Sequence, residues 1–135
     1  MNGARLGQAI GRFLMSVIFM LSGAGKLMQF SGTADMMASK GIPLAHIALA
    51  LSIIIEIGGG LALLAGFKLR YVALVMALWL VPVTLVFHNF WACQGQDRMM
   101  QQTNFLKNLA IIGGLLVTGY ADRLSRPLAR ASAGR

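Results

Sequence analysis

One acidic residue stands out because it lies inside an apolar stretch long enough to cross a membrane. Glu56 lies 12 residues past the start of residues 44–66, which is roughly 18 Å along an α-helix. An ionisable side chain near the bilayer centre costs about 2.5–3.5 kcal/mol on insertion scales, so it needs a partner or a wet cavity. Ser52, Gly59 and Leu63 share its helical face. We predict that this face points inward and that Glu56 binds a ligand or transfers protons. The alternative is a structural role, as one member of an ion pair or as a neutral acid hydrogen-bonded between helices.

Other polar side chains lie near the ends of the predicted spans. All of these ends are on the same side of the membrane. Lys26 closes the first span, His88 lies one turn before the end of the third, and Lys107 lies one turn into the fourth. Thr84, His88 and Trp91 recur at i, i+4 and i+7 and therefore share one stripe of a helix. We predict a pocket that opens on this side of the membrane and whose wall residues are Lys26, His88, Asn104, Lys107 and Asn108.

Each of these residues also has a structural interpretation, and the sequence leaves both open. Lys26 and Lys107 can extend their ammonium groups to lipid head groups instead of a ligand. Trp91 and Tyr120 occupy positions typical of interfacial aromatic anchors. His88 can serve as a hydrogen-bonding residue near the interface. With one other histidine and a single cysteine in the chain, we predict no bound metal.

The elements that must position these residues are four apolar stretches, and they predict an all-α fold. A membrane-spanning helix needs roughly 20 apolar residues, and four stretches of about this length run over residues 6–28, 44–66, 70–91 and 104–120. Short connections predict an antiparallel, up-down-up-down four-helix bundle in a single membrane domain, residues 1–135. We expect loops at 29–43, with room for one turn of helix, and at 93–103, and a basic tail at 121–135.

Composition separates this chain from soluble domains and from nucleic-acid-binding proteins. Of its 135 residues 57% are hydrophobic and 12% are charged, against about a quarter charged in an average soluble domain. The net charge of +8 comes from residues at span ends and in the tail, so we predict a lipid bilayer as the surroundings and no nucleic-acid partner. Cys93 is the only cysteine, which excludes an intramolecular disulfide and a dithiol redox pair.

The basic residues also predict the orientation, because cytoplasmic flanks carry the excess of Lys and Arg. One side of the predicted bundle holds four of them, Lys26, Lys40, Arg98 and Lys107. The other side holds eight, which are Arg5, Arg12, Lys68, Arg70, Arg123, Arg126, Arg130 and Arg135. The second side is predicted to be cytoplasmic, and an even number of spans places both termini there.

Several short motifs together resemble one family of membrane proteins. The motif residues are Ser22, Gly23, Lys26 and Leu27; Gly41 and Pro43; Glu56, Gly58, Gly59 and Gly66; Phe87, His88, Asn89, Phe90 and Trp91; and Phe105, Leu106, Lys107, Asn108 and Leu109. Over about residues 12–120 they resemble the DoxX family of small bacterial four-helix membrane proteins. The resemblance implies a multi-pass protein of the bacterial inner membrane and a link with quinone-dependent oxidation of sulfur compounds.

Two hypotheses of function follow from the residues and the resemblance. In the first, the chain is a subunit of a quinone-linked oxidoreductase, a partner protein supplies electrons, and Glu56 and His88 exchange protons. A quinone head group or a small anion would then contact Lys26, Trp91, Asn104, Lys107 and Asn108. In the second, the chain is a non-catalytic scaffold, an anchor, or a binder of hydrophobic ligands or cargo. Gly7 and Gly11 form a small-xxx-small pair that permits a homo-oligomer.

Overall fold

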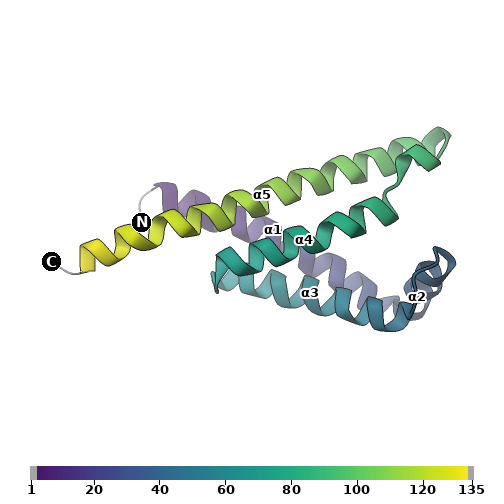
Figure 1. The fold of residues 1–135 in the computed structure, drawn as a ribbon, viewed down its shortest axis with the longest axis horizontal. Helices are drawn as coiled ribbons and strands as arrows, with labels where there is room; N and C mark the ends of the chain where they lie inside the picture. The colour runs from purple at the N-terminus through teal and green to yellow at the C-terminus, as the bar shows by residue number, and fades with distance from the viewer. Residues whose placement is uncertain (1–2, 134–135) are drawn as a thin grey trace. The chain divides into compact units, whose positions relative to one another are not determined.

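The chain is helical along most of its length, as the sequence predicts. In the computed structural model, the fold of residues 3–133 and the side chains of residues 3–122 are described. In chain order the elements are α1 (Gly3–Met28), α2 (Phe30–Ser39), α3 (Ala45–Ala65), α4 (Leu69–Phe87), the short 3₁₀ helix η1 (Phe90–Ala92) and α5 (Gly95–Ala133) (Figure 1). No strand occurs among residues 3–133, and the all-α class is confirmed.

Both predicted outer loops are more helical than expected. The first contains α2, a helix of 10 residues, where one turn was expected; Ala34 and Met37 are buried and give it an inner face. The second was predicted as a loop up to residue 103, and this prediction is wrong because α5 begins at Gly95. Its first turns are rich in Gln and Met, which favour helix, and their polarity is that of a helix outside the bilayer.

Three helical segments are long and apolar enough to cross a membrane within the described part of the chain. They are Gly3–Met28, Ala45–Ala65 and Leu69–Ala92. The fourth predicted span, residues 104–120, lies within α5, which has 39 residues and is not among these three. At 1.5 Å per residue α5 is roughly 58 Å long, about twice the hydrocarbon thickness. The four-helix bundle therefore stays a prediction.

The chain divides between Phe67 and Lys68 into two compact units. In the first unit, α1 and α3 pack together at two glycines. A Cβ atom at Gly23 would lie 2.6 Å from Ile57 Cγ1, and one at Gly60 would lie 2.9 Å from Met20 Cγ. The absence of both side chains lets the two backbones approach closely, as small residues do in membrane helices. Residues 23 and 57 meet, as do 20 and 60, so α1 and α3 run antiparallel.

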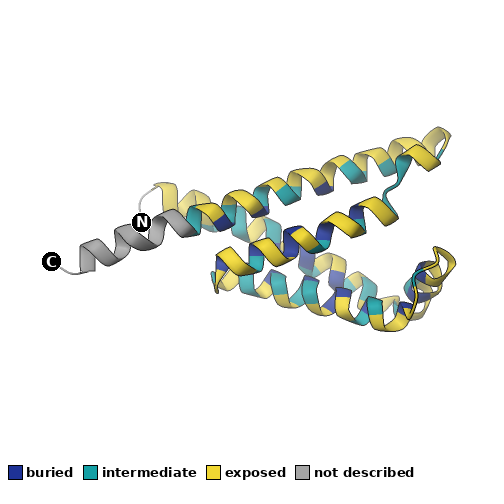
Figure 2. Ribbon diagram, viewed as in Figure 1, coloured by how far each residue is buried: buried dark blue, intermediate teal, exposed yellow. Residues whose placement is uncertain are grey.

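Buried residues recur every three or four positions along α3 and form one face, as the helical period requires. Figure 2 shows it as dark segments along the helix, and its members are Ala45, Leu49, Ser52, Ile53, Glu56, Gly60 and Leu63. The predicted inward face is thus confirmed at positions 52, 56 and 63, whereas Gly59 is half-buried. α2 packs against α3 as well.

In the second unit, α4 packs against α5. Leu80 and Thr84 of α4 are buried, as are Asn108 and Leu115 of α5. A Cβ atom at Gly119 would lie 3.4 Å from the Cβ of Ala73. Because residue 73 meets residue 119 and residue 84 meets residue 108, these two helices are also antiparallel.

Large apolar side chains cover much of the outer surface of the helices. Leu21 is 69% exposed and Ile54 is 66% exposed. Water disfavours exposed apolar side chains that gather in large patches, whereas lipid tails accept them. The exposed residues therefore agree with the spans that hydropathy identifies.

Gly66 ends α3, as the sequence predicts, by taking a left-handed conformation with φ +72°. The Phe67 N–H donates to the Ala62 carbonyl at 2.9 Å and the Gly66 N–H donates to the Leu63 carbonyl at 3.2 Å, which satisfies the last carbonyls of the helix. A Cβ atom here would also lie 2.8 Å from Arg12 Nη1. Gly58 differs because it is inside the helix and a Cβ atom there would meet nothing within 4 Å.

Gly66→Ala is expected to lower the free energy of unfolding by about 1–2 kcal/mol, because an L side chain is strained in the left-handed region. The matched control Gly58→Ala is expected to raise it by roughly 0.5–1 kcal/mol, because alanine favours the helix interior. Thermal unfolding in mild detergent, followed by loss of helical circular dichroism, measures both. Equal unfolding of Gly66→Ala and the wild type would contradict this account of the cap.

Candidate functional site

The central feature of the first unit is an ion pair between α1 and α3. Lys26 Nζ lies 2.5 Å from Glu56 Oε1, and Glu56 is only 3% exposed. The contact follows from the glycine packing, because a Cβ atom at Gly23 would lie 3.4 Å from the Cβ of Glu56. A lysine one helical turn further along α1 then reaches the carboxylate. Lys26 is therefore the partner that a buried acid in a span requires.

Two donors converge on the same oxygen of this carboxylate. Ser52 Oγ donates to Glu56 Oε1 at 3.3 Å, alongside the Lys26 ammonium. The other oxygen, Oε2, is buried and has no hydrogen-bond partner in the part of the chain that the structure describes. A buried acceptor without a partner costs free energy, so a donor group that reached Oε2 would relieve this cost.

Lys26 supplies a donor next to this acceptor. Its ammonium carries three N–H groups, of which one donates to Ser22 Oγ at 3.0 Å and another to Glu56 Oε1. The side chain is 26% exposed, so the third N–H can be reached from outside. The partly exposed Lys26 ammonium thus lies beside a carboxylate whose unpartnered oxygen is buried. Ser22 and Ser52 are members of this polar network that the sequence analysis did not assign to the site.

His88 lies in the second unit, where it ends α4 and contacts the first part of α5. Its Nδ1 is 2.8 Å from Gln101 Oε1. With the amide oxygen as acceptor, the proton lies on Nδ1 and Nε2 keeps its lone pair. Gln101 was not predicted as a partner because residues 93–103 were expected to form a loop.

Asn108 makes a hydrogen bond between helices. It is buried, its Nδ2 donates to Thr84 Oγ1 at 3.0 Å, and Thr84 Oγ1 donates to the Leu80 carbonyl at 2.6 Å. Side-chain hydrogen bonds between helices in a membrane contribute about 0.6 kcal/mol on average. The structure therefore gives Asn108 a packing role, and its predicted role in ligand binding stays a prediction.

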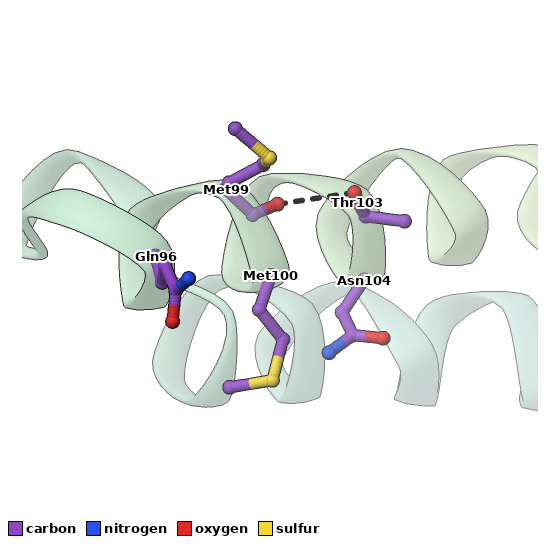
Figure 3. A pocket seen from close by; sticks show the side chains of 5 residues that line it. All are labelled: Gln96, Met99, Met100, Thr103 and Asn104. Carbon is purple, nitrogen blue, oxygen red and sulfur yellow. Dashed lines mark hydrogen bonds between the residues drawn. The ribbon is translucent and has the colours of Figure 1, made fainter.

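Asn104 and Lys107 lie at the surface of α5. Lys107 Nζ donates to Asn104 Oδ1 at 3.0 Å. Asn104 also lines an open hollow of about 410 Å³, together with Gln96, Met99, Met100 and Thr103. Figure 3 shows Gln96, Met100 and Asn104 pointing to one side of the helix, and Met99 to the other.

Trp91 lies in η1, which follows α4, and belongs to an aromatic group there. Its ring is edge-on to Phe90, with centroids 5.4 Å apart, and to Phe105 at 6.0 Å. It remains 56% exposed. Exposed aromatic rings at the end of a span are typical of the membrane interface, so this geometry favours the anchor interpretation of Trp91 over ligand contact.

The predicted site residues thus fall into two groups, one in each unit. Lys26 and Glu56 form a direct pair in the first unit. In the second unit, His88, Asn104, Lys107 and Asn108 each have a neighbour on α4 or α5. The single outer pocket that the sequence predicts stays a prediction.

The fold and the ion pair define a helical membrane protein with a charged pair between two of its helices, and comparison with known proteins gives its family. The DoxX family model matches residues 7–89, and the chain belongs to this family. It is 38% identical over 112 residues to inner membrane protein YqjF of Escherichia coli K12, covering 83% of this chain and 81% of that one. It is 29% identical over 108 residues to inner membrane protein YphA of the same organism, covering 80% and 77%.

Both of these relatives are named as inner membrane proteins. The family match includes Lys26, Glu56 and His88 and ends at residue 89, before α5 begins. The resemblance was expected as far as residue 120, and its last part therefore lies outside the family match. No solved structure matches the chain significantly.

Lys26→Met is expected to lower the free energy of unfolding by about 3 kcal/mol, because it leaves the Glu56 carboxylate buried without a counter-charge. The double variant Lys26→Met/Glu56→Gln is expected to recover most of this loss, since it removes both charges. Unfolding of wild type, both single variants and the double variant in detergent forms a complete cycle. Additive effects of the two changes would show that the pair does not couple α1 to α3.

Proposed function

We propose that the chain binds a membrane quinone as a subunit of an inner-membrane oxidoreductase, with the head group at the Lys26–Glu56 pair. The observation that carries this proposal is the buried, unpartnered Glu56 Oε2 beside a partly exposed lysine. An isoprenoid quinone has a long apolar tail, which lipid and the apolar faces of α1 and α3 accept. Its head group offers oxygen atoms that need a few well-placed polar partners.

The residues of the pair have complementary roles in this proposal. Lys26 donates a hydrogen bond to a head-group oxygen, and Glu56 accepts one from a head-group hydroxyl. Reduction of a quinone takes up two electrons and two protons. We propose that Glu56 passes a proton in this reaction and that His88, whose Nε2 keeps its lone pair, acts in it as a general acid and base. A partner protein at the outer face supplies the electrons.

We further propose four spans, with the apolar part of α5, residues 104–120, as the fourth. The excess of Lys and Arg on one side supports this topology, with both termini in the cytoplasm and Lys26 in the outer half. The ends of α5 would then project from the membrane, because the helix is about twice as long as the hydrocarbon layer is thick.

A structural role is the second candidate, and the packing at Gly23 supports it. The Lys26–Glu56 pair joins α1 to α3 at the point of close approach, where it fixes the register of the two helices. In this case the chain acts as a scaffold or anchor for a partner, or binds another hydrophobic ligand.

Protein purified in mild detergent is expected to retain a quinone that organic extraction and mass spectrometry detect. Glu56→Gln is expected to reduce the amount per protein about tenfold, because the acceptor for the head group is lost. Asp35→Asn is the matched control, since Asp35 is an exposed acid on α2 and its change to the amide is expected to leave the quinone in place. Equal quinone in all three proteins would show that the quinone does not bind at Glu56, and a phospholipid alone in all three would favour the structural role.

A reporter enzyme that is active only after export is expected to be inactive when fused after residue 135 and active when fused after residue 41. The first fusion follows four spans and the second follows one. Activity at both positions would show that α5 does not cross the membrane and that the chain has three spans.

A further inference from the structure

The arrangement of donors around Glu56 determines which form of a head group the site prefers. Lys26 Nζ and Ser52 Oγ both donate to Oε1, as expected for a carboxylate ion facing an ammonium. Oε2 is left buried, with no donor in the part of the chain that the structure describes. The unpartnered position in the network is therefore a buried carboxylate oxygen, which is an acceptor.

We propose that the Lys26–Glu56 site binds the reduced, hydroxyl-bearing form of a quinone more tightly than the oxidised form. This inference rests on the proposed quinone function and specifies its ligand. The contacts around the pair give the reason, because a carboxylate oxygen accepts hydrogen bonds and cannot donate them. An oxidised quinone offers only carbonyl oxygens at its head, and a carbonyl oxygen facing Oε2 is repelled.

A quinol satisfies the same oxygen. Its hydroxyl donates to Oε2 in a charge-assisted hydrogen bond, which is roughly twice as strong as a neutral one. Binding also relieves the desolvation cost of the buried, unpartnered oxygen. Both terms act in the same direction and favour the reduced form.

Lys26 does not reverse this preference. Two of its three N–H groups are engaged by Ser22 and Glu56, and the third can donate to a carbonyl oxygen or to a hydroxyl oxygen. It therefore positions either form of the head group. Discrimination between the two forms depends on Glu56.

The expected preference is about tenfold or more in the dissociation constant, from the strength of one hydrogen bond to a charged group. For a two-electron couple, a tenfold preference for the reduced form raises the midpoint potential of the bound quinone by about 30 mV. The preference can thus be measured by binding and by potentiometry.

The experiment measures binding of decylubiquinone and decylubiquinol, the latter under anaerobic conditions, to the full-length protein in lipid nanodiscs. Wild type is expected to bind the quinol about tenfold more tightly. Glu56→Gln is expected to lose or reverse the preference, because its amide nitrogen can donate to a quinone carbonyl. Ser52→Ala keeps the carboxylate and Lys26, and is expected to keep the preference.

The outcomes separate this inference from the proposed function. Equal binding of both forms to wild type, or a preference that persists in Glu56→Gln, would overturn the quinol inference while quinone binding stands. Binding of neither form to wild type would overturn both. If Glu56→Gln is not stable, the double variant Lys26→Met/Glu56→Gln takes its place, and it too must lose the preference.

Discussion

A carboxylate among the side chains of a membrane helix cannot remain alone, and this constraint organises the first unit. Glu56 is buried, and the nearest charge that α1 can offer is Lys26. The ion pair restores part of the solvation that the carboxylate loses in an apolar environment. It also holds α1 against α3. The contact that stabilises the buried carboxylate is therefore also the contact that forms the polar site.

The pair depends in turn on how closely the two helices approach. Side chains larger than hydrogen at Gly23 or Gly60 would meet Ile57 or Met20 at less than ordinary contact distance. Because the backbones lie close, a lysine on one helix reaches an acid on the other and has N–H groups for two acceptors. Packing by small residues thus sets the geometry of the charges, and the charges set the chemistry of the site.

The second unit uses polar residues differently. Asn108 and Thr84 satisfy each other between α4 and α5, and the hydroxyl of Thr84 also donates to a backbone carbonyl. His88 and Gln101 meet at the end of the same helix pair. Among the described residues three buried side-chain atoms have no hydrogen-bond partner: Glu56 Oε2 and Arg12 Nε in the first unit and Trp79 Nε1 in the second. Of these three only Oε2 is an acceptor, and it lies beside the partly exposed Lys26, which is why the proposed ligand site lies at this pair.

The sequence by itself determined the helical class, three apolar spans, the glycine that ends α3 and the inward face of Glu56, because hydropathy and helical period are local properties of the chain. It missed α2 as a full helix and the start of α5, since polar residues outside a bilayer resemble a loop. Only the tertiary structure decided the partners. Lys26 meets Glu56 across 30 residues, Thr84 meets Asn108 across 24, and His88 meets Gln101 across 13. Such pairs depend on which helix faces pack together, and no local pattern contains that information.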